Sequence, residues 1–305
     1  MRFWLAQVVI FATACLIMGD LRAQAQSPIP DVEPGKSCPL FSAFRDQSSD
    51  PEISVAGVTF SGFLRMPVSD QDEIAASIKG RTYKHSLDQL NQTTKEALGI
   101  ATAGWQNHGY LKVEVNGYAT AVGSGTTTQR VALSIHVDEG PQYRLGAIAF
   151  NHNRAIANVA ALLRVFPIKE GDVFSHEKIA IGLENLRKVY GELGYANFTS
   201  VSETRFDERR KLVYLDIDVD EGKQFYVGAI SILGVDGSSG SQILKDLPLK
   251  PGQIYNERLV ELFLKNQHGA VLPNCECNNL SSLQPDEKAG LVTITFDFRP
   301  CLGGS

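Results

Sequence analysis

The sequence has no run of four or more Lys and Arg residues, and its net charge is −5. Proteins that bind nucleic acid through charge carry a basic excess, so this balance argues against a nucleic-acid partner. Hydrophobic residues make up 43% of the 305 positions, which is typical of a globular protein and not of a disordered one. The length is sufficient for two or three domains.

Long apolar runs are missing beyond the N-terminus. Phe3–Gly19 is apolar, follows the basic residue Arg2, and precedes Ala23-Gln24-Ala25, which fits a signal-peptidase site. We therefore expect residues 1–25 to be a cleaved secretory signal peptide and the mature chain to be soluble. The sequence also lacks the long series of alternating strands that an outer-membrane barrel requires.

Two other interpretations of the N-terminus stay open. The apolar stretch could be retained as an inner-membrane anchor. Residues 12–15 also loosely resemble a lipobox, which would place a lipid on Cys15, although the usual leucine is absent and the apolar run continues past it.

Cysteine and histidine are scarce, and neither is spaced as metal ligands are. Four cysteines would remain after cleavage, and an even number in an exported protein permits two disulfides with three alternative pairings. Cys275-Glu276-Cys277 is not the C-x-x-C of a zinc knuckle, and the six histidines are scattered. We expect disulfides, no metal and no cofactor. The candidate disulfide residues are Cys38, Cys275, Cys277 and Cys301.

No group of residues has the pattern of a catalytic site. Asp216, Asp218 and Asp220 lie on one face of an expected strand, where a solvated row is favoured over a Ca²⁺ site because a turn glycine is absent. Ser124 lacks the strand–turn–helix context of a hydrolase nucleophile. Glu139 and Glu221 are each followed by Gly, which suggests a role in a turn. We therefore predict that the protein is not an enzyme and has no small-molecule substrate.

A repeat of about 80 residues dominates the chain after a proline-rich linker at residues 26–50. Three segments alternate apolar and polar residues, which is the period of a strand with one buried face. The nearly identical stretches VDEGPQYRLGAIAF and VDEGKQFYVGAISI follow the first two of these segments and predict joints between units. The alternating segments begin at Val131, Val213 and Val292.

Each unit is predicted to run strand–helix–helix–strand–strand. In the middle unit, apolar residues at helical spacing between Ile156 and Phe166 predict a first helix, and Ser175 is the expected N-cap of a second helix that stops at Gly194. The short connection between the last two strands predicts a hairpin. The expected fold class is α+β, with three tandem units that each place two helices on a three-stranded mixed sheet.

This order resembles POTRA (polypeptide-transport-associated) domains. The resemblance is carried by the Gly-x-x-Phe/Tyr loop before the second helix, by Tyr190-Gly191-Glu192-Leu193-Gly194-Tyr195, and by the closing Val-Asp-Glu-Gly. It covers roughly residues 51–300 and is only partial in the third unit, which lacks the Gly-Tyr pair and the closing Glu-Gly. We expect units at 51–141, 142–223 and 224–301, with a tail at 302–305.

POTRA domains occur before barrels of the BamA and TamA type, in two-partner secretion transporters, and singly in FtsQ-type division proteins. The resemblance therefore implies a periplasmic scaffold that handles unfolded polypeptide or docks accessory proteins. The implied partners are outer-membrane barrel or assembly proteins and unfolded polypeptide clients, with membrane association only through partners. The implied location is the periplasm near the outer membrane, and no barrel sequence is present. The alternative is an inner-membrane-tethered adaptor of the cell-division type.

In this family the second strand usually forms the sheet edge, to which an extended peptide can add as another strand. The groove between the helices and the sheet is an alternative peptide site. The expected edge residues are Leu111, Lys112, Val113, Glu114, Val115 and Asn116 in the first unit, and Ala196, Asn197, Phe198, Thr199, Ser200, Val201 and Ser202 in the second.

Overall fold

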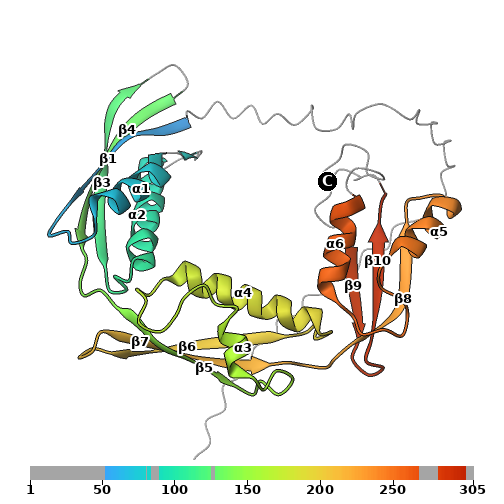
Figure 1. The fold of residues 1–305 in the computed structure, drawn as a ribbon. Helices are drawn as coiled ribbons and strands as arrows, with labels where there is room; N and C mark the ends of the chain where they lie inside the picture. Colours follow the sequence, from blue (N-terminus) through green and yellow to red (C-terminus); the bar gives the residue numbers. More distant parts are fainter. Residues whose placement is uncertain (1–51, 80, 84–88, 125–127, 268–280, 300–305) are drawn as a thin grey trace, which may run out of the picture. The chain divides into compact units, whose positions relative to one another are not determined.

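The computed structural model describes residues 52–79, 81–83, 89–124, 128–267 and 281–299. These residues form three separate sheets, each with helices on one of its faces (Figure 1). The α+β class and the three tandem units are therefore confirmed. The expected signal peptide, the linker and all the cysteines lie outside the described residues.

The first unit contains a sheet of four strands in the order β2-β1-β4-β3, in which β1 is parallel to β4 and β3 is antiparallel to β4. The three predicted strands are present, and a two-residue strand is added to them, because Thr82 and Tyr83 of the loop before the second helix pair with Ser54 and Ile53. The elements are β1 (Glu52–Ser61), α1 (Val68–Lys79), β2 (Thr82–Tyr83), α2 (Gln89–Asn107), β3 (Glu114–Ser124) and β4 (Thr128–Asp138).

The second unit has the strand order β5-β7-β6, and its first helix is shorter than the apolar spacing predicts. After Leu163 the backbone N–H groups bond to carbonyls three residues earlier, so the helix tightens into turns. Asn185 holds these turns by donating to the carbonyl of Val165 at 2.9 Å. The elements are β5 (Arg144–Asn151), α3 (Val159–Leu163), α4 (His176–Glu192), β6 (Thr199–Asp207) and β7 (Leu212–Asp220).

The third unit repeats this topology with the order β8-β10-β9. Its second strand, β9, lies in a segment that the sequence pattern did not identify as a strand. In the second and third units the loop before the second helix adds a single bridge to the first strand, Arg144 to Val173 and Tyr226 to Ile254. The elements are β8 (Tyr226–Leu233), α5 (Gly237–Asp246), α6 (Glu257–Gln267), β9 (Ser281–Asp286) and β10 (Leu291–Asp297).

Each core forms between the helices and the inward residues of the central strand. The alternating residues that predicted β4, β7 and β10 are buried on that face. In the second unit α4 begins as predicted, since the hydroxyl of Ser175 accepts from the N–H of Lys178 at 3.3 Å. Gly182 lets the ring of Phe166 pack against the helix, because a Cβ there would lie 2.0 Å from that ring.

The two joints between units repeat one set of backbone contacts. The carbonyl of Gly109, just after α2, accepts from the N–H of Tyr143 at 2.8 Å, and Gly194 accepts from Phe225 at the same distance. Both glycines have positive φ, 84° and 91°, a conformation that ends a helix and that other residues rarely adopt. The helix end of one unit is thereby fastened to the first residues of the next.

A side-chain contact reinforces each joint. In the first joint, Lys112 Nζ lies 2.5 Å from Glu208 Oε1 in the β6–β7 turn, and the Tyr143 hydroxyl donates to Glu208 Oε2 at 2.7 Å. In the second joint, Asn197 donates to Glu287 in the β9–β10 turn at 2.9 Å. The same contact is thus charged in the first joint and uses a neutral donor in the second.

The charged contact at Glu208 should make the stability of the first joint depend on pH in the acidic range. Hydrogen bonds from Lys112 and then Tyr143 lower the pKa of Glu208 from 4.5 to about 2. A lowered folded-state pKa stabilises the fold above pH 4.5, and this stabilisation is lost as the pH falls toward 2. We expect Glu208→Gln to reduce the fall in Tm over this window, measured by calorimetry. Glu203→Gln, on exposed β6, is the control, and equal Tm profiles for the two variants would contradict the assignment.

Candidate functional site

In each unit the strand that follows the second helix, which is β3, β6 or β9, lies at one edge of the sheet, as the predicted topology requires. Among the described residues β3 pairs only with β4, β6 only with β7, and β9 only with β10. One side of each of these strands therefore carries backbone N–H and C=O groups with no strand beside them.

The edge strands begin three residues later than predicted. Glu114–Asn116 and Thr199–Ser202 lie in β3 and β6, but 111–113 and 196–198 lie in the turns before them. The reason is packing: Leu111 and Ala196 pack against the core of the following unit. Val113 and Phe198 are buried in the cores of their own units. These two turns therefore serve the joints.

The three edges differ in how open they are to another strand. β3 has eleven residues, one charged residue (Glu114) and no proline. β6 has nine residues and carries Arg205, which pairs with Asp216 at 2.7 Å. β9 has six residues and contains Pro285, which has no N–H to donate. Short length, charge, proline and β-bulges are devices by which proteins block strand addition. β3 has a register shift only near its end, at Val122, so Glu114–Ala121 is the least protected edge among the three strands.

The side chains of β3 are small on the face toward α2 and larger on the open face. Gly117 lies beneath α2, where a Cβ would come 3.3 Å from Leu98 Cδ2 and 2.5 Å from the carbonyl oxygen of Ser134. On the other face Tyr118, opposite Ser134 in the register, is 65% exposed. An exposed aromatic ring beside an edge can pack against a side chain of an added strand.

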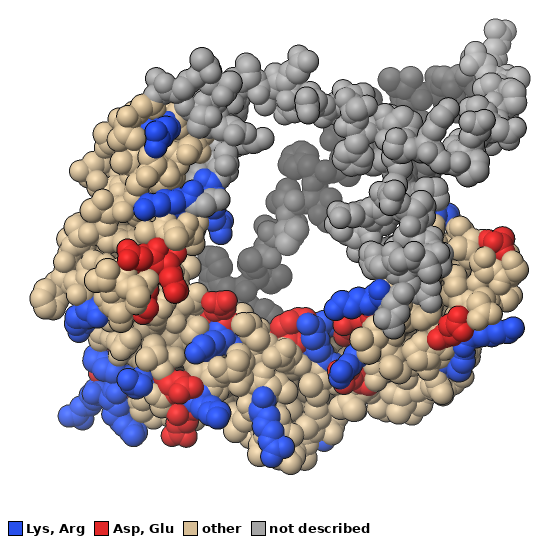
Figure 2. Space-filling view, turned by 45° about the horizontal axis from the view of Figure 1, so that its top comes forward, with Lys and Arg blue, Asp and Glu red and all other residues tan. Residues whose placement is uncertain are grey.

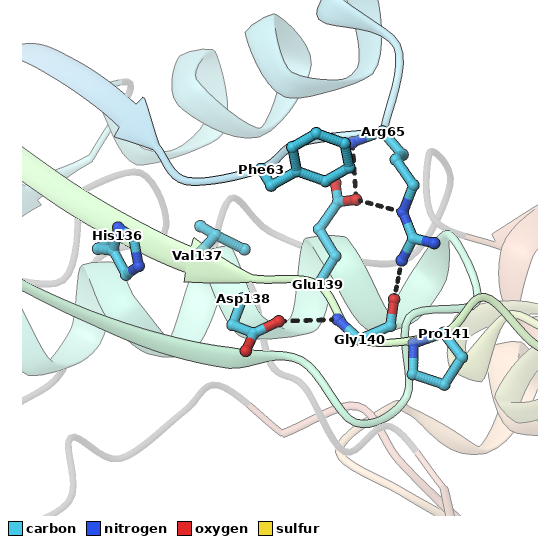
Figure 3. Close-up of a pocket in the computed structure, with 8 residues that line it drawn as sticks. All are labelled: Phe63, Arg65, His136, Val137, Asp138, Glu139, Gly140 and Pro141. Carbon is cyan, nitrogen blue, oxygen red and sulfur yellow. Dashed lines mark hydrogen bonds and ion pairs between the residues drawn. The ribbon is translucent and has the colours of Figure 1, made fainter.

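A pocket of about 540 Å³ lies where β4 ends, between the β1–α1 loop and the turn that leads to β5 (Figure 3). Phe63 is 86% exposed at this pocket, whereas Glu139 is 1% exposed. The lining residues are Phe63, Arg65, His136, Val137, Asp138, Glu139, Gly140 and Pro141.

The Glu139 carboxylate is fully engaged in holding the unit together. It accepts from the N–H of Arg65 at 2.7 Å, and from the N–H of Met66 and Trp105 Nε1 at 3.0 Å each. The guanidinium of Arg65 lies 3.5 Å from it and also donates to the carbonyl of Gly140. These donors occupy both oxygens of the carboxylate, so Glu139 links the β1–α1 loop to α2.

Glu139 and Glu221 precede glycines of positive φ, Gly140 at 63° and Gly222 at 64°, but the side-chain hydrogen bonds of these turns come from the preceding aspartates. Asp138 accepts from the N–H of Gly140 at 3.2 Å, and Asp220 accepts from Gly222 at 3.1 Å. The glutamates instead anchor the loop after the first strand to an aromatic residue of the second helix.

The second unit repeats this anchor with different residues. Glu221 accepts from the N–H of Ala155 at 2.8 Å and from the Tyr190 hydroxyl at 3.0 Å. Burial, and then this carboxylate, raises the pKa of Tyr190 well above its usual value. The sequence did carry a signal, since Trp105 and Tyr190 both lie four residues before the glycine of a Gly-Tyr pair. In the third unit Phe298 follows the strand-end aspartate, so this anchor is absent there.

Other candidate groups are already paired with neighbours. Asp216 binds Arg205, and Asp218 lies 2.5 Å from His152 Nδ1. Within the described part of the chain, no cluster of three or more His, Cys, Asp and Glu side chains could hold a metal ion. Ser124 ends β3.

The visible surface mixes charges of both signs. Figure 2 shows Lys and Arg side chains beside Asp and Glu side chains on this face, with no continuous field of either sign. No helix in the described ranges has the length and apolarity needed to cross a membrane.

Comparison with known proteins identifies the domain type. Residues 143–222 match the family model POTRA, described as "Surface antigen variable number repeat". The crystal structure of POTRA domains 3–5 of Haemophilus influenzae BamA superimposes with a TM-score of 0.60 at 22% identity, over 82% of this chain and 97% of that one. At this identity the likeness shows the fold, so the three units are domains of the POTRA fold.

Two curated relatives are much longer proteins. One, from Treponema pallidum (strain Nichols), is named for outer membrane protein assembly and is 29% identical over 189 residues, which is 61% of this chain and 22% of the relative. BamA of Neisseria meningitidis serogroup B is 23% identical over 231 residues, 72% of this chain and 29% of the relative. The chain spans less than a third of either one.

The anchor role of Glu139 predicts that Glu139→Gln destabilises the first unit by about 2–4 kcal/mol, because the amide turns an NH₂ group toward buried donors. Trp105, which donates to this carboxylate, reports the unfolding of this unit by fluorescence in urea. Glu114→Gln, at the exposed start of β3, is the matched control. An unfolding midpoint for Glu139→Gln equal to that of the control would show that the carboxylate is not an anchor.

Proposed function

We propose that these three POTRA-type domains form a periplasmic, non-enzymatic scaffold that binds unfolded polypeptide during outer-membrane protein assembly or secretion, with the β3 edge as the binding site. The names of the longer relatives refer to outer membrane protein assembly, and this supports the process. The expected signal peptide at residues 1–25 supports the location.

Strand addition is the proposed mode of binding. An extended segment placed beside β3 would bond to the N–H and C=O groups that point away from β4. These bonds involve only the main chain, so they suit a scaffold that meets many different sequences. Side chains of the segment would alternate between the α2 side and the Tyr118 side, and this alternation would supply a modest preference.

The observation that carries the proposal is the unprotected character of β3. It is the longest of the three edge strands, it has a single charged residue at its start, and it lacks proline. Natural edge strands of this length are usually shielded against pairing. The eight residues from Glu114 to Ala121, which precede the register shift at Val122, form an open edge that is best explained by a partner strand.

Docking of folded partners requires a different kind of surface. We place contact with outer-membrane barrel or assembly proteins at the first unit, where Phe63 is exposed beside the Glu139 pocket. An exposed aromatic ring next to a concave surface is typical of a protein-protein contact.

The β3 proposal is tested with a photo-crosslinking amino acid introduced at Tyr118, or at Gln284 as the matched position on β9. Both residues are exposed on the open face of an edge strand, since their partners in the register are Ser134 and Thr293. In cells, unfolded outer-membrane protein precursors should crosslink several-fold more at Tyr118 than at Gln284. Equal crosslinking at the two positions would overturn the assignment of β3 as the site.

A further inference from the structure

The register of the strands and the short link between the first two units bring the end of β6 and the start of β3 to the same joint. Glu114 starts β3 and pairs with Asp138, the last residue of β4. Five residues link β4 to Arg144, the first residue of β5. Arg144 pairs with Leu212 of β7, which pairs with Asp207, the last residue of β6.

Side chains close the remaining gap between the two strands. Lys112 lies two residues before β3, Glu208 directly follows β6, and their charged groups are 2.5 Å apart. β6 runs toward this joint and β3 runs away from it. A path that follows β6 to the joint and then β3 away from it therefore runs from N-terminus to C-terminus along both strands.

We infer that β6 and β3 form one tandem edge, on which a single extended polypeptide segment pairs with both strands. This inference rests on the proposed function and extends it to a second strand. Because both strands have the same direction, the segment keeps one orientation, antiparallel or parallel, throughout. The strands contribute nine and eleven residues, so the segment needs about 20 residues in two blocks, plus a short spacer across the joint.

The chemistry along the tandem edge differs between its parts. The β3 block faces almost no charge, which suits a segment of apolar and hydroxyl residues. The spacer passes the Lys112–Glu208 pair, where polar residues avoid the burial of apolar surface against charge. The β6 block passes Glu203 and Arg205, which tolerate polar side chains.

The tandem edge ends at the second joint. The last residue of β9, Asp286, pairs with Leu291 at the start of β10, and so lies at the joint from which β6 begins. Pro285 directly precedes it and lacks the N–H that a continuing strand would bond. The segment is thus expected to stop at Thr199 instead of continuing onto β9.

The test uses labelled synthetic peptides and fluorescence anisotropy with the full mature chain. The short probe is a nine-residue peptide of alternating Thr and Val. The long probe is two such blocks joined by Gly-Ser-Gly-Ser, and its control carries proline at alternate positions of one block. Once the first block is bound, binding of the second block is intramolecular. We therefore expect the long probe to bind at least about tenfold more tightly than the short probe. The proline control should bind like the short probe.

Proline variants of β6 test whether the tighter binding of the long probe depends on this strand. Neighbouring N–H groups of a strand point to opposite sides, so only one of Ser202→Pro and Glu203→Pro removes an N–H that points away from β7. The variant that keeps the wild-type Tm is the one used for the binding measurements. It should bind the short probe normally and lose the gain of the long probe. In the unsubstituted protein, a photoreactive residue in each block of the long probe should label β3 and β6.

The outcomes separate the two proposals. Failure of the short probe to bind would overturn the proposed function at β3. A short probe that binds, together with a long probe that binds no more tightly, would overturn the tandem edge alone. The tandem edge would also be overturned if the β6 variant still bound the long probe more tightly than the short one. The same holds if the photoreactive long probe labelled β3 alone.

Discussion

The parallel pairing of the first and third strands in each unit determines what the second strand can do. β1 lies beside β4, β5 beside β7 and β8 beside β10, each pair parallel. A parallel pair needs a crossover, which the helices provide, and the hairpin then places the second strand on the far side of the third. The second strand is consequently an edge in all three units, and the three edges differ in how each is protected.

The same pairing organises the joints. Since the third strand ends beside the start of the second, the short link to the next unit brings the turn after β6 close to the start of β3, where Lys112 contacts Glu208. The glycines that close α2 and α4 bring the helix end to the same place, and their carbonyls bond to the first residue of the following unit. Within the first two units, the glutamate that follows the third strand then fixes the loop after the first strand, as Glu139 does in the first unit by binding Arg65, Met66 and Trp105. Sheet edges and joints are therefore products of one topology.

Much of this fold could be predicted from the sequence because its signals are local and repeated. The alternation around Val213, the N-cap Ser175 and the terminating Gly194 each depend on neighbouring residues, and each was confirmed. The start of β3 could not be placed, because Leu111 packs against a different unit and its apolar character looks like that of a strand residue. The role of Glu139 was missed for a similar reason, since its donors lie 34 and more than 70 residues away in sequence. The difference between the edges appeared only when β9 and its Pro285 were located.

The central claim is that β3 accepts an added strand, and amide hydrogen exchange measured by NMR tests it most directly. An unfolded outer-membrane protein segment is added to the labelled chain, and exchange is compared residue by residue. Strand addition predicts slower exchange at alternate residues of β3, those whose N–H groups point away from β4, with β9 unchanged. Protection confined to α2 and the groove beside it, or no change along β3, would contradict the claim.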